Sequence, residues 1–273
     1  MPTLRVAAFQ GSCANGNITQ NFNTLRDCVS RAARDRVDIL LMPECFLTGY
    51  FESFEDAFIH SIDLASWATK DMFLELGKWS SPTIILGLNE RDDQRIFNTA
   101  VVIEHGCVVG KYRKAYTYAP YDYYSTGSDF PIFEKNGIPY GIVICYDIMY
   151  REPALITSLK GARFIFCPMN NKVPTDSPML PHLSEKQHLT ARAFDSNCWL
   201  ICSDVVIDTP PFICPGSATI IDSNGSVHLS TRPFQTELIS MTIDVPNLNL
   251  PRKKRWNGSP HLAKQLAHHL GIV

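Results

Sequence analysis

Short runs of almost continuous apolar residues constrain the fold of this chain more than any other feature of its sequence. The clearest run covers residues 37–42, where Asp38 is the one interruption, and further runs cover 83–88, 140–145 and 164–167. A strand with one solvated face alternates apolar and polar residues, whereas a strand that is buried on both faces does not. The runs therefore predict a sheet that is sandwiched between layers.

Helical periodicity predicts the layers that cover this sheet. In the first helix the apolar positions are spaced by four and three residues. They are Ile18, Phe22, Leu25, Val29 and Ala32. Further helices are expected over 64–79, 151–161 and 182–196, and hairpins with short glycine-containing links over 98–112 and 218–229. The order helix, strand, proline occurs twice, so two similar α/β halves are expected to deliver strand ends to a common edge.

Three of the predicted strands end at a side chain with useful chemistry. Glu44 follows one apolar run, Lys114 follows a hairpin strand, and Cys145 closes another apolar run. A free thiol titrates near about 8.5 and needs a base or a positive neighbour, and an ammonium can stabilise a developing oxyanion. Because a cysteine in an apolar run often packs as a small hydrophobe, the prediction of an amide-cleaving site rests on all three residues together.

Composition and charge argue against several classes of function. The chain has 273 residues, 45% of them hydrophobic and 19% charged, and its net charge of -2 disfavours nucleic acid or an anionic membrane as a partner. No window has the roughly 20 apolar residues that a membrane helix needs. The nine cysteines form no zinc-binding pattern and lie mostly in apolar runs, which favours reduced thiols in a cytoplasmic protein and no metal site.

Three short motifs follow one another along the chain: Pro43-Glu44, Tyr112-Arg113-Lys114 and Cys145-Tyr146-Asp147. Together they resemble the three signatures of the nitrilase, or carbon–nitrogen hydrolase, superfamily and of its amidase-like branch. The resemblance extends over essentially the whole chain, so it implies one domain over residues 1–273. It also implies a four-layer α-β-β-α sandwich of the α/β (α+β) class, a homodimer or larger homo-oligomer, and no cofactor. The segment from about 245 to 273 is expected to be an arm or a subunit contact.

The resemblance also implies roles for the motif residues. Glu44 is expected to be the general base, Lys114 to stabilise the tetrahedral intermediate, and Cys145 to be the nucleophile. The backbone amide of Tyr146 would complete the oxyanion hole. The thiolate attacks a carbonyl or nitrile carbon, ammonia or an amine leaves, and water releases the acid from the thioester.

The chain departs from the family pattern in the segment after Lys114. Many relatives carry a histidine two residues after the lysine and a further glutamate a few residues later, whereas this chain has Tyr116 and no glutamate there. Asp122 is the nearest carboxylate, and its side chain is one methylene shorter. Asp122 is therefore either a second carboxylate of the site or a residue that caps a turn.

Residues around the motifs predict the wall of a substrate pocket. Tyr50 and Tyr118 lie in aromatic-rich loops that flank the motifs, and Met169 and Asn170 follow a predicted strand. Together with Tyr146 they are the candidate pocket residues. Relatives commonly have an aromatic residue after that strand, so its absence here makes the wall more polar. The aromatic residues could form a pocket for an apolar or cationic substrate, but for any single one of them the sequence favours loop packing or a subunit contact.

The sequence favours a cysteine-dependent hydrolase that releases ammonia or an amine from a small amide or an N-carbamoyl compound. One alternative is a nitrilase that acts on a nitrile. Another, motivated by the missing glutamate, is a catalytically silent relative that serves as a binding or scaffold protein. A papain-like enzyme would need a histidine base, and none of the eight histidines lies in a suitable motif. The sequence does not specify the substrate, the leaving group or the size of the oligomer.

Overall fold

Helices separate strands in two parts of the chain, whereas the strands within residues 83–142 and within residues 199–244 follow one another directly. The computed structural model describes residues 3–79, 82–118, 121–180, 186–245, 264–265 and 267–268. The named helices are α1 (Ile18–Arg34), α2 (Phe54–Ile59), α3 (Trp67–Leu74), α4 (Arg151–Leu159), α6 (Gln187–Ser196) and the 3-10 helices η1 (Glu75–Lys78) and η2 (Cys145–Met149). The strands are β1 (Thr3–Gly11), β2 (Ile39–Leu41), β3 (Thr83–Asp92), β4 (Arg95–Glu104), β5 (Cys107–Arg113), β6 (Phe133–Lys135), β7 (Ile138–Ile142), β8 (Phe164–Pro168), β9 (Val173–Pro174), β10 (Trp199–Val205), β11 (Phe212–Ile213), β12 (Thr219–Ile221), β13 (Val227–Ser230) and β14 (Glu237–Asp244).

Twelve of these strands are connected into one sheet, with the order β5-β4-β3-β2-β1-β10-β8-β7-β6. β14 pairs antiparallel with β1, and β12 and β13 continue the sheet from β10. β1 and β10 pair at two positions, Gln10 with Asp204 and Gly11 with Val205. The sheet therefore divides into two halves, which are joined at the carboxyl ends of β1 and β10.

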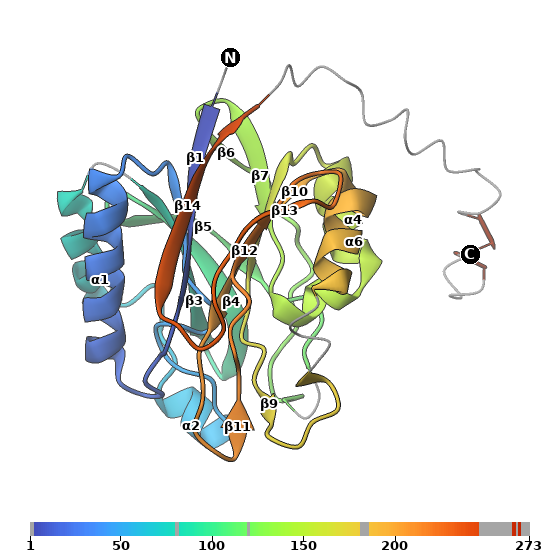
Figure 1. Ribbon diagram of the computed structural model, residues 1–273. Coiled ribbons are helices and arrows are strands. Elements are labelled where there is room, and N and C mark those ends of the chain that lie inside the picture. The colour runs from blue at the N-terminus through green and yellow to red at the C-terminus, as the bar shows by residue number, and fades with distance from the viewer. Residues whose placement is uncertain are drawn as a thin grey trace.

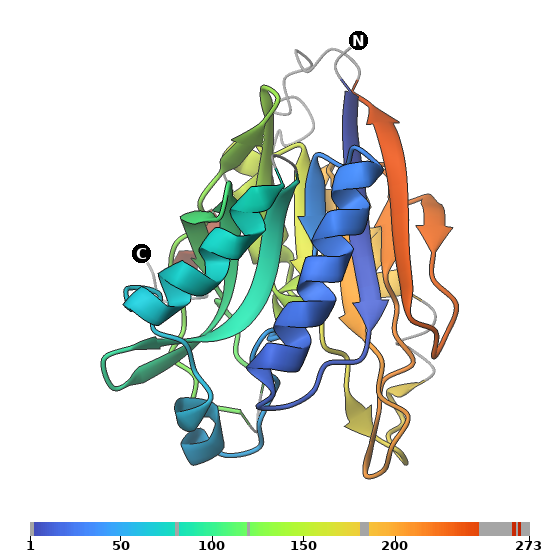
Figure 2. The same cartoon turned by 90° about the vertical axis from the view of Figure 1, so that its left-hand side faces the viewer.

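The two halves of the sheet pack face to face. Val6 and Ala8 of β1 share one buried core with Tyr140 and Ile142 of β7 and with side chains of β8. Two further cores lie on the outer faces, where α1 and α3 cover one half and α4 and α6 cover the other, as Figures 1 and 2 show. The layers follow the order helix, sheet, sheet, helix, so the predicted four-layer α-β-β-α sandwich is confirmed.

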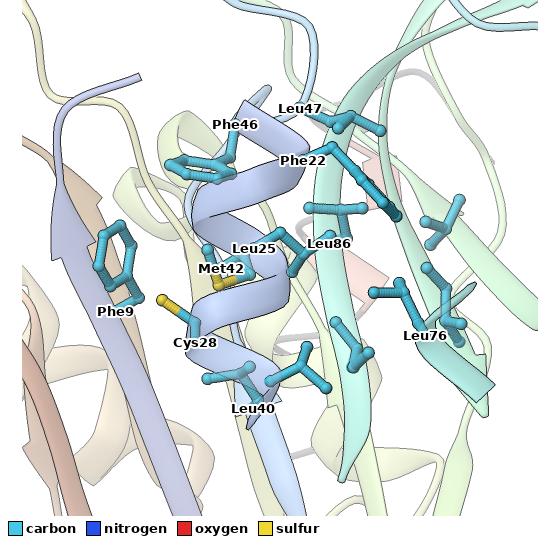
Figure 3. Close-up of a cluster of buried hydrophobic side chains, with 14 of the residues drawn as sticks. Phe9, Phe22, Leu25, Cys28, Leu40, Met42, Phe46, Leu47, Leu76 and Leu86 are labelled. Carbon is cyan, nitrogen blue, oxygen red and sulfur yellow. The ribbon is translucent and has the colours of Figure 1, made fainter. Parts of the chain in front are cut away.

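The first helix shows how the sequence builds an outer layer. Asn17 caps α1, because its Oδ1 accepts a 3.0 Å hydrogen bond from the backbone N–H of Gln20. Phe22 and Leu25 of α1 lie in one buried core with Leu86 of β3, as Figure 3 shows. Burial of one leucine or phenylalanine side chain contributes about 1.5–3 kcal/mol, so the apolar face of α1 fixes it on the sheet.

Two predicted helices differ in length from the observed ones. The helix expected over 64–79 begins later, because the side chain of Ser66 caps α3, and it continues as η1. The helix expected over 182–196 is observed from Gln187, and residues 182–185 lie outside the described residues. Every helix in the described ranges is too short or too polar to cross a lipid bilayer.

The two-residue strands β9 and β11, which pair with each other, and the strand β14 were not predicted from the sequence. β14 is the longest of the three. Its sequence alternates apolar and polar residues from Ile239 to Asp244, and Ile239, Met241 and Ile243 belong to the core between the two sheet halves. The segment that follows β14 includes the predicted arm or subunit contact over 245–273. Most of that segment lies outside the described residues.

Candidate active site

The ends of β2 and β8 meet near the junction of the two sheet halves. The backbone N–H of Glu44 donates a 3.2 Å hydrogen bond to the carbonyl oxygen of Met169. Gly87 of β3 permits this arrangement, since a Cβ there would lie 2.3 Å from the carbonyl oxygen of Pro43 and 2.8 Å from Cα of Glu44. The prediction that both halves deliver strand ends to a common edge is confirmed.

Glu44 and Lys114 form a buried ion pair at this edge. Their side chains are 1% and 2% exposed, and Nζ of Lys114 lies 2.6 Å from Oε1 of Glu44. The side-chain amide of Asn98 donates a second hydrogen bond of 2.6 Å to the same oxygen. Oε2 of Glu44 has no hydrogen-bond partner within the described part of the chain. One carboxylate oxygen is therefore fixed, and the other is available to accept a proton.

Cys145 occupies a sharp turn between β7 and η2. Its φ is +42°, a left-handed conformation that is uncommon for a residue with a side chain and that often marks a functional position. The thiol is partly exposed, and Sγ lies 3.8 Å from the carbonyl oxygen of Asn170 and 3.7 Å from Oδ1 of Asn171. The turn therefore presents the thiol at the surface of a cavity.

Asp147 stabilises this turn. Its buried carboxylate accepts hydrogen bonds of 2.9 Å from the backbone N–H of Ile144 and 2.8 Å from the hydroxyl of Tyr112. It also accepts a 2.8 Å hydrogen bond from the backbone N–H of Tyr116. One carboxylate thus connects the turn that carries the thiol to the segment that follows Lys114.

The charges of the site act in opposite directions on the thiol and on the ammonium. Burial and the carboxylate of Glu44 raise the pKa of Cys145 well above its usual range, and Lys114 partly opposes this effect. Burial alone would lower the pKa of Lys114, but Glu44, Cys145 and Asp147 together raise it. The resting site therefore holds a neutral thiol near a charged lysine, and a base must remove the thiol proton before attack.

One cavity of about 140 Å³ brings most of the predicted residues together. Its lining includes Glu44, Lys114 and Cys145 with the predicted pocket residues Tyr50, Tyr118, Tyr146 and Asn170. Pockets for drug-sized ligands measure about 300–1,000 Å³. This cavity is smaller, so it suits a molecule smaller than a drug. Within the described ranges, no three or more His, Cys, Asp or Glu side chains are grouped as a metal site would require.

Two predicted site residues lie elsewhere. Met169 is fully buried in the core beneath α4 and α6, and its backbone rather than its side chain contacts Glu44. Asp122 is exposed and does not line the cavity. Glu44 is the one carboxylate among the described residues of the cavity lining.

Two residues that support the site, Asn98 and Asp204, were not predicted from the sequence. The fully buried carboxylate of Asp204 accepts hydrogen bonds of 2.8 Å from Nδ2 of Asn171 and 2.7 Å from the hydroxyl of Ser217. It thereby fixes the amide whose Oδ1 faces the thiol. Asp204 lies near the carboxyl end of β10, just beyond its run of apolar residues, a position similar to that of Glu44 after β2, whereas Asn98 interrupts the apolar part of β4 and gives no such signal.

The sandwich and its site define a nitrilase-like protein. The sequence profile of the carbon–nitrogen hydrolase family matches residues 5–252. The chain therefore belongs to the carbon–nitrogen hydrolase family, and the predicted membership of the nitrilase superfamily is confirmed.

Similar proteins include a nitrilase, an amidase and a synthetase. The nitrilase of Pyrococcus abyssi is 25% identical over 241 residues, which cover 87% of each chain. The 2-oxoglutaramate amidase of Bacillus subtilis is 25% identical over 228 residues, 81% of this chain and 84% of that one. The structure of a glutamine-dependent NAD+ synthetase from Acinetobacter baumannii matches with a TM-score of 0.77 at 21% identity. That match covers 89% of this chain and 46% of the synthetase, and at this identity it supports the fold alone.

Proposed function

We propose that this chain is a cysteine-dependent amidohydrolase, which releases ammonia or an amine from a small amide or an N-carbamoyl compound. One observation carries the proposal. Glu44 is held through one carboxylate oxygen and is free at the other, in the cavity to which Cys145 presents its thiol. Similarity to a 2-oxoglutaramate amidase, a protein named for its action on an amide, supports this class of substrate.

The first half of the proposed reaction forms a thioester. Oε2 of Glu44 accepts the thiol proton, and Sγ of Cys145 attacks the carbonyl carbon. Lys114 and the backbone N–H of Tyr146 donate hydrogen bonds to the oxyanion, since N–H groups in the first turn of η2 have no partner within that helix. Loss of one such donor raises the barrier by about 3–4 kcal/mol. The C–N bond then breaks, and Glu44 returns its proton to the leaving nitrogen.

The second half of the proposed reaction releases the acid. Glu44, again unprotonated, accepts a proton from a water molecule, and the oxygen of that water attacks the thioester carbon. The second tetrahedral intermediate uses the same oxyanion donors. When it collapses, the C–S bond breaks and the proton on Glu44 returns to the sulfur of Cys145.

Replacement of the nucleophile tests this proposal. Purified Cys145→Ala should release no ammonia from any amide in a panel that the wild-type protein hydrolyses. Cys107→Ala is the matched control, because Cys107 is an exposed free thiol at the start of β5 and should be dispensable. Turnover by Cys145→Ala at the wild-type rate would refute the thioester mechanism.

Two alternative functions are separated by the same panel. A nitrilase would release ammonia from nitriles in preference to the matched amides, and similarity to a nitrilase favours this candidate. A silent binding protein would hydrolyse neither class. The buried pair of Glu44 and Lys114 favours an enzyme, because a binding role would not require two charges to be kept out of water beside a thiol.

We also propose that the chain forms a homodimer in the cytoplasm. α4 and α6 expose apolar side chains on an outer layer, namely Ile156, Leu159 and Phe194, and such patches are typical of subunit contacts. Light scattering should report twice the 30.7 kDa of one chain, and Phe194→Glu should shift the protein toward the monomer.

The cysteines support the proposed cytoplasmic location. All nine are free, which is typical of a reducing compartment.

A further inference from the structure

A second lysine, Lys172, lies in the wall of the cavity and has no part in the chemistry proposed above. It directly follows Asn171, whose Oδ1 lies 3.7 Å from Sγ of Cys145. Its side chain is 8% exposed. Lysine side chains are rarely this buried unless they are paired. The groups around this ammonium therefore determine whether its charge can attract a ligand.

Three aromatic rings surround the ammonium of Lys172. Nζ lies 5.0 Å from the ring centroid of Tyr50, 5.2 Å from that of Tyr121 and 4.8 Å from that of Phe212. A cation within about 6 Å of a ring is attracted to its face. The rings hold the ammonium in one place but do not neutralise its charge, so Lys172 provides a fixed positive charge in the cavity wall.

The counter-ion of Lys172 lies outside the cavity. Glu52 forms an ion pair with Nζ, its side chain is 53% exposed, and it also accepts hydrogen bonds of 3.1 and 3.2 Å from the hydroxyl of Tyr121. Among the described residues that line the cavity, Glu44 and Lys114 neutralise one another. Lys172 therefore leaves the lining with an excess of one positive charge, which favours an anionic ligand.

We propose that Lys172 binds a carboxylate at the far end of the substrate, so that the preferred substrates are small amides that also carry a free carboxylate. This inference rests on the proposed amidohydrolase function and narrows its substrate class. An ammonium has three N–H donors, of which one serves Glu52 and a second serves the carbonyl oxygen of Tyr50 at 3.4 Å. A substrate carboxylate can bind beside Glu52 or replace it, because a half-exposed carboxylate regains water when it is displaced.

Two kinds of compound share this chemistry. The monoamide of a dicarboxylic acid and an N-carbamoyl amino acid each have a –C(=O)NH2 group and a carboxylate a few bonds apart. Both fit the size of the cavity, about 140 Å³, which holds a small molecule. Hydrolysis of the first gives ammonia and the dicarboxylic acid, whereas hydrolysis of the second gives ammonia, carbon dioxide and the free amino acid, so the products distinguish the two.

The test compares three amides of equal length with different end groups. They are the monoamide of glutaric acid, pentanamide and 4-aminobutanamide, which end in a carboxylate, a methyl group and an ammonium. The wild-type protein should have a kcat/KM for the carboxylate at least about 10-fold above that for pentanamide, and the ammonium should be the poorest. Lys172→Met should lower the ratio of carboxylate to pentanamide by about 10- to 100-fold, mainly through KM, since a charge-assisted hydrogen bond is lost. Lys172→Arg should retain most of the ratio.

A second variant, Glu52→Gln, separates substrate binding from a purely structural role of the ion pair. It removes the competing carboxylate but keeps the ammonium, so the same ratio should rise. If Lys172→Met keeps the wild-type ratio, or if the wild-type protein hydrolyses the three amides equally, the carboxylate site is refuted and the proposed amidohydrolase stands. If neither these amides nor an N-carbamoyl amino acid is hydrolysed, the proposed function fails and this inference fails with it.

Discussion

Lys114 donates a 2.6 Å hydrogen bond from Nζ to Oε1 of Glu44, and neither side chain is more than 2% exposed. An isolated charge at either position would be strongly unfavourable, so each of the two depends on the other. The contact has two consequences. It contributes to folding, and it keeps the lysine charged beside a thiol that is itself neutral at rest.

The first prediction concerns the lysine of this pair. Lys114→Met should destabilise the protein by about 3–5 kcal/mol, because Glu44 is left buried without its counter-ion. It should also lower kcat for a hydrolysed amide by at least about 100-fold, because a donor to the oxyanion is lost. Urea denaturation and ammonia release measure the two effects.

The double variant Lys114→Met/Glu44→Gln is the control for this prediction. It removes both charges, so it should recover much of the lost stability while remaining inactive. A single Lys114→Met variant as stable as the wild type would show that the pair does not support the fold.

The second prediction concerns the ionisation of the thiol. The carboxylate of Glu44 raises the pKa of Cys145, so Glu44→Gln should lower that pKa and increase the thiolate fraction at any pH below it. Turnover of amides should be lost, because the proton acceptor is gone, while alkylation of Cys145 at pH 8 by iodoacetamide should become faster. The pH profile of alkylation, followed by intact-mass analysis, gives the midpoint for each protein.

Lys114→Met should move the same midpoint in the opposite direction, because its ammonium lowers the pKa of Cys145. The two variants together determine whether the neighbouring charges control the thiol. A midpoint that is identical in the wild type and in Glu44→Gln would contradict that view.

The proposed catalytic residues could be predicted from the sequence because each one follows a strand. A buried strand restricts the position of the residues just beyond its end, so Glu44 and Cys145 are placed by the same apolar runs that predict the sheet. A loop has no regular backbone geometry that would fix the direction of each side chain. Asp122 lies in a loop, where spacing along the chain does not tell which way a side chain points, and its side chain is exposed.

The residues that support the catalytic groups were harder to predict. Asn98 lies within β4, and its side-chain amide contacts Glu44, which is 54 residues earlier in the sequence. In the sequence it looks like any polar residue that interrupts an apolar strand. Asn171 lies in the loop after β8 and acquires its role from Asp204 of β10. Contacts of this kind depend on the register between strands, and no local pattern encodes that register.

A third prediction concerns Asp122. Because its side chain is exposed and does not line the cavity, Asp122→Asn should change kcat/KM by less than about twofold and the free energy of unfolding by less than about 0.5 kcal/mol. Steady-state kinetics and thermal unfolding provide the measurements. A large loss of activity with unchanged stability would restore the role of a second catalytic carboxylate to this residue.

A fourth prediction concerns Asp147, whose carboxylate accepts hydrogen bonds from Tyr112, Ile144 and Tyr116. In Asp147→Asn one acceptor oxygen becomes an NH2 group that faces other donors, so the variant should lose about 1–3 kcal/mol of stability. The turn at Cys145 should also shift, which lowers kcat. Tyr112→Phe is the matched control, since it removes a single donor and should have the smaller effect on both quantities.

The last prediction concerns Asp204, which acts on the thiol through Asn171. Both oxygens of its carboxylate accept hydrogen bonds from Asn171, one from the backbone N–H at 3.1 Å and one from Nδ2 at 2.8 Å. In Asp204→Asn the new NH2 group must face one of these donors, and the side chain of Asn171 can relieve the conflict by turning its own NH2 group toward Cys145. A donor beside sulfur favours the thiolate, so the midpoint of alkylation of Cys145 should fall while kcat decreases.

Ser217→Ala separates this positioning role from a general loss of structure. Ser217 donates a 2.7 Å hydrogen bond to Asp204 and accepts a longer one of 3.2 Å from Nδ2 of Asn171. Its removal leaves the carboxylate of Asp204 and both hydrogen bonds that this carboxylate accepts from Asn171 in place. Ser217→Ala should therefore lose about 1 kcal/mol of stability and keep the wild-type midpoint for alkylation. If both variants keep that midpoint, Asp204 supports the fold without orienting the amide beside the thiol.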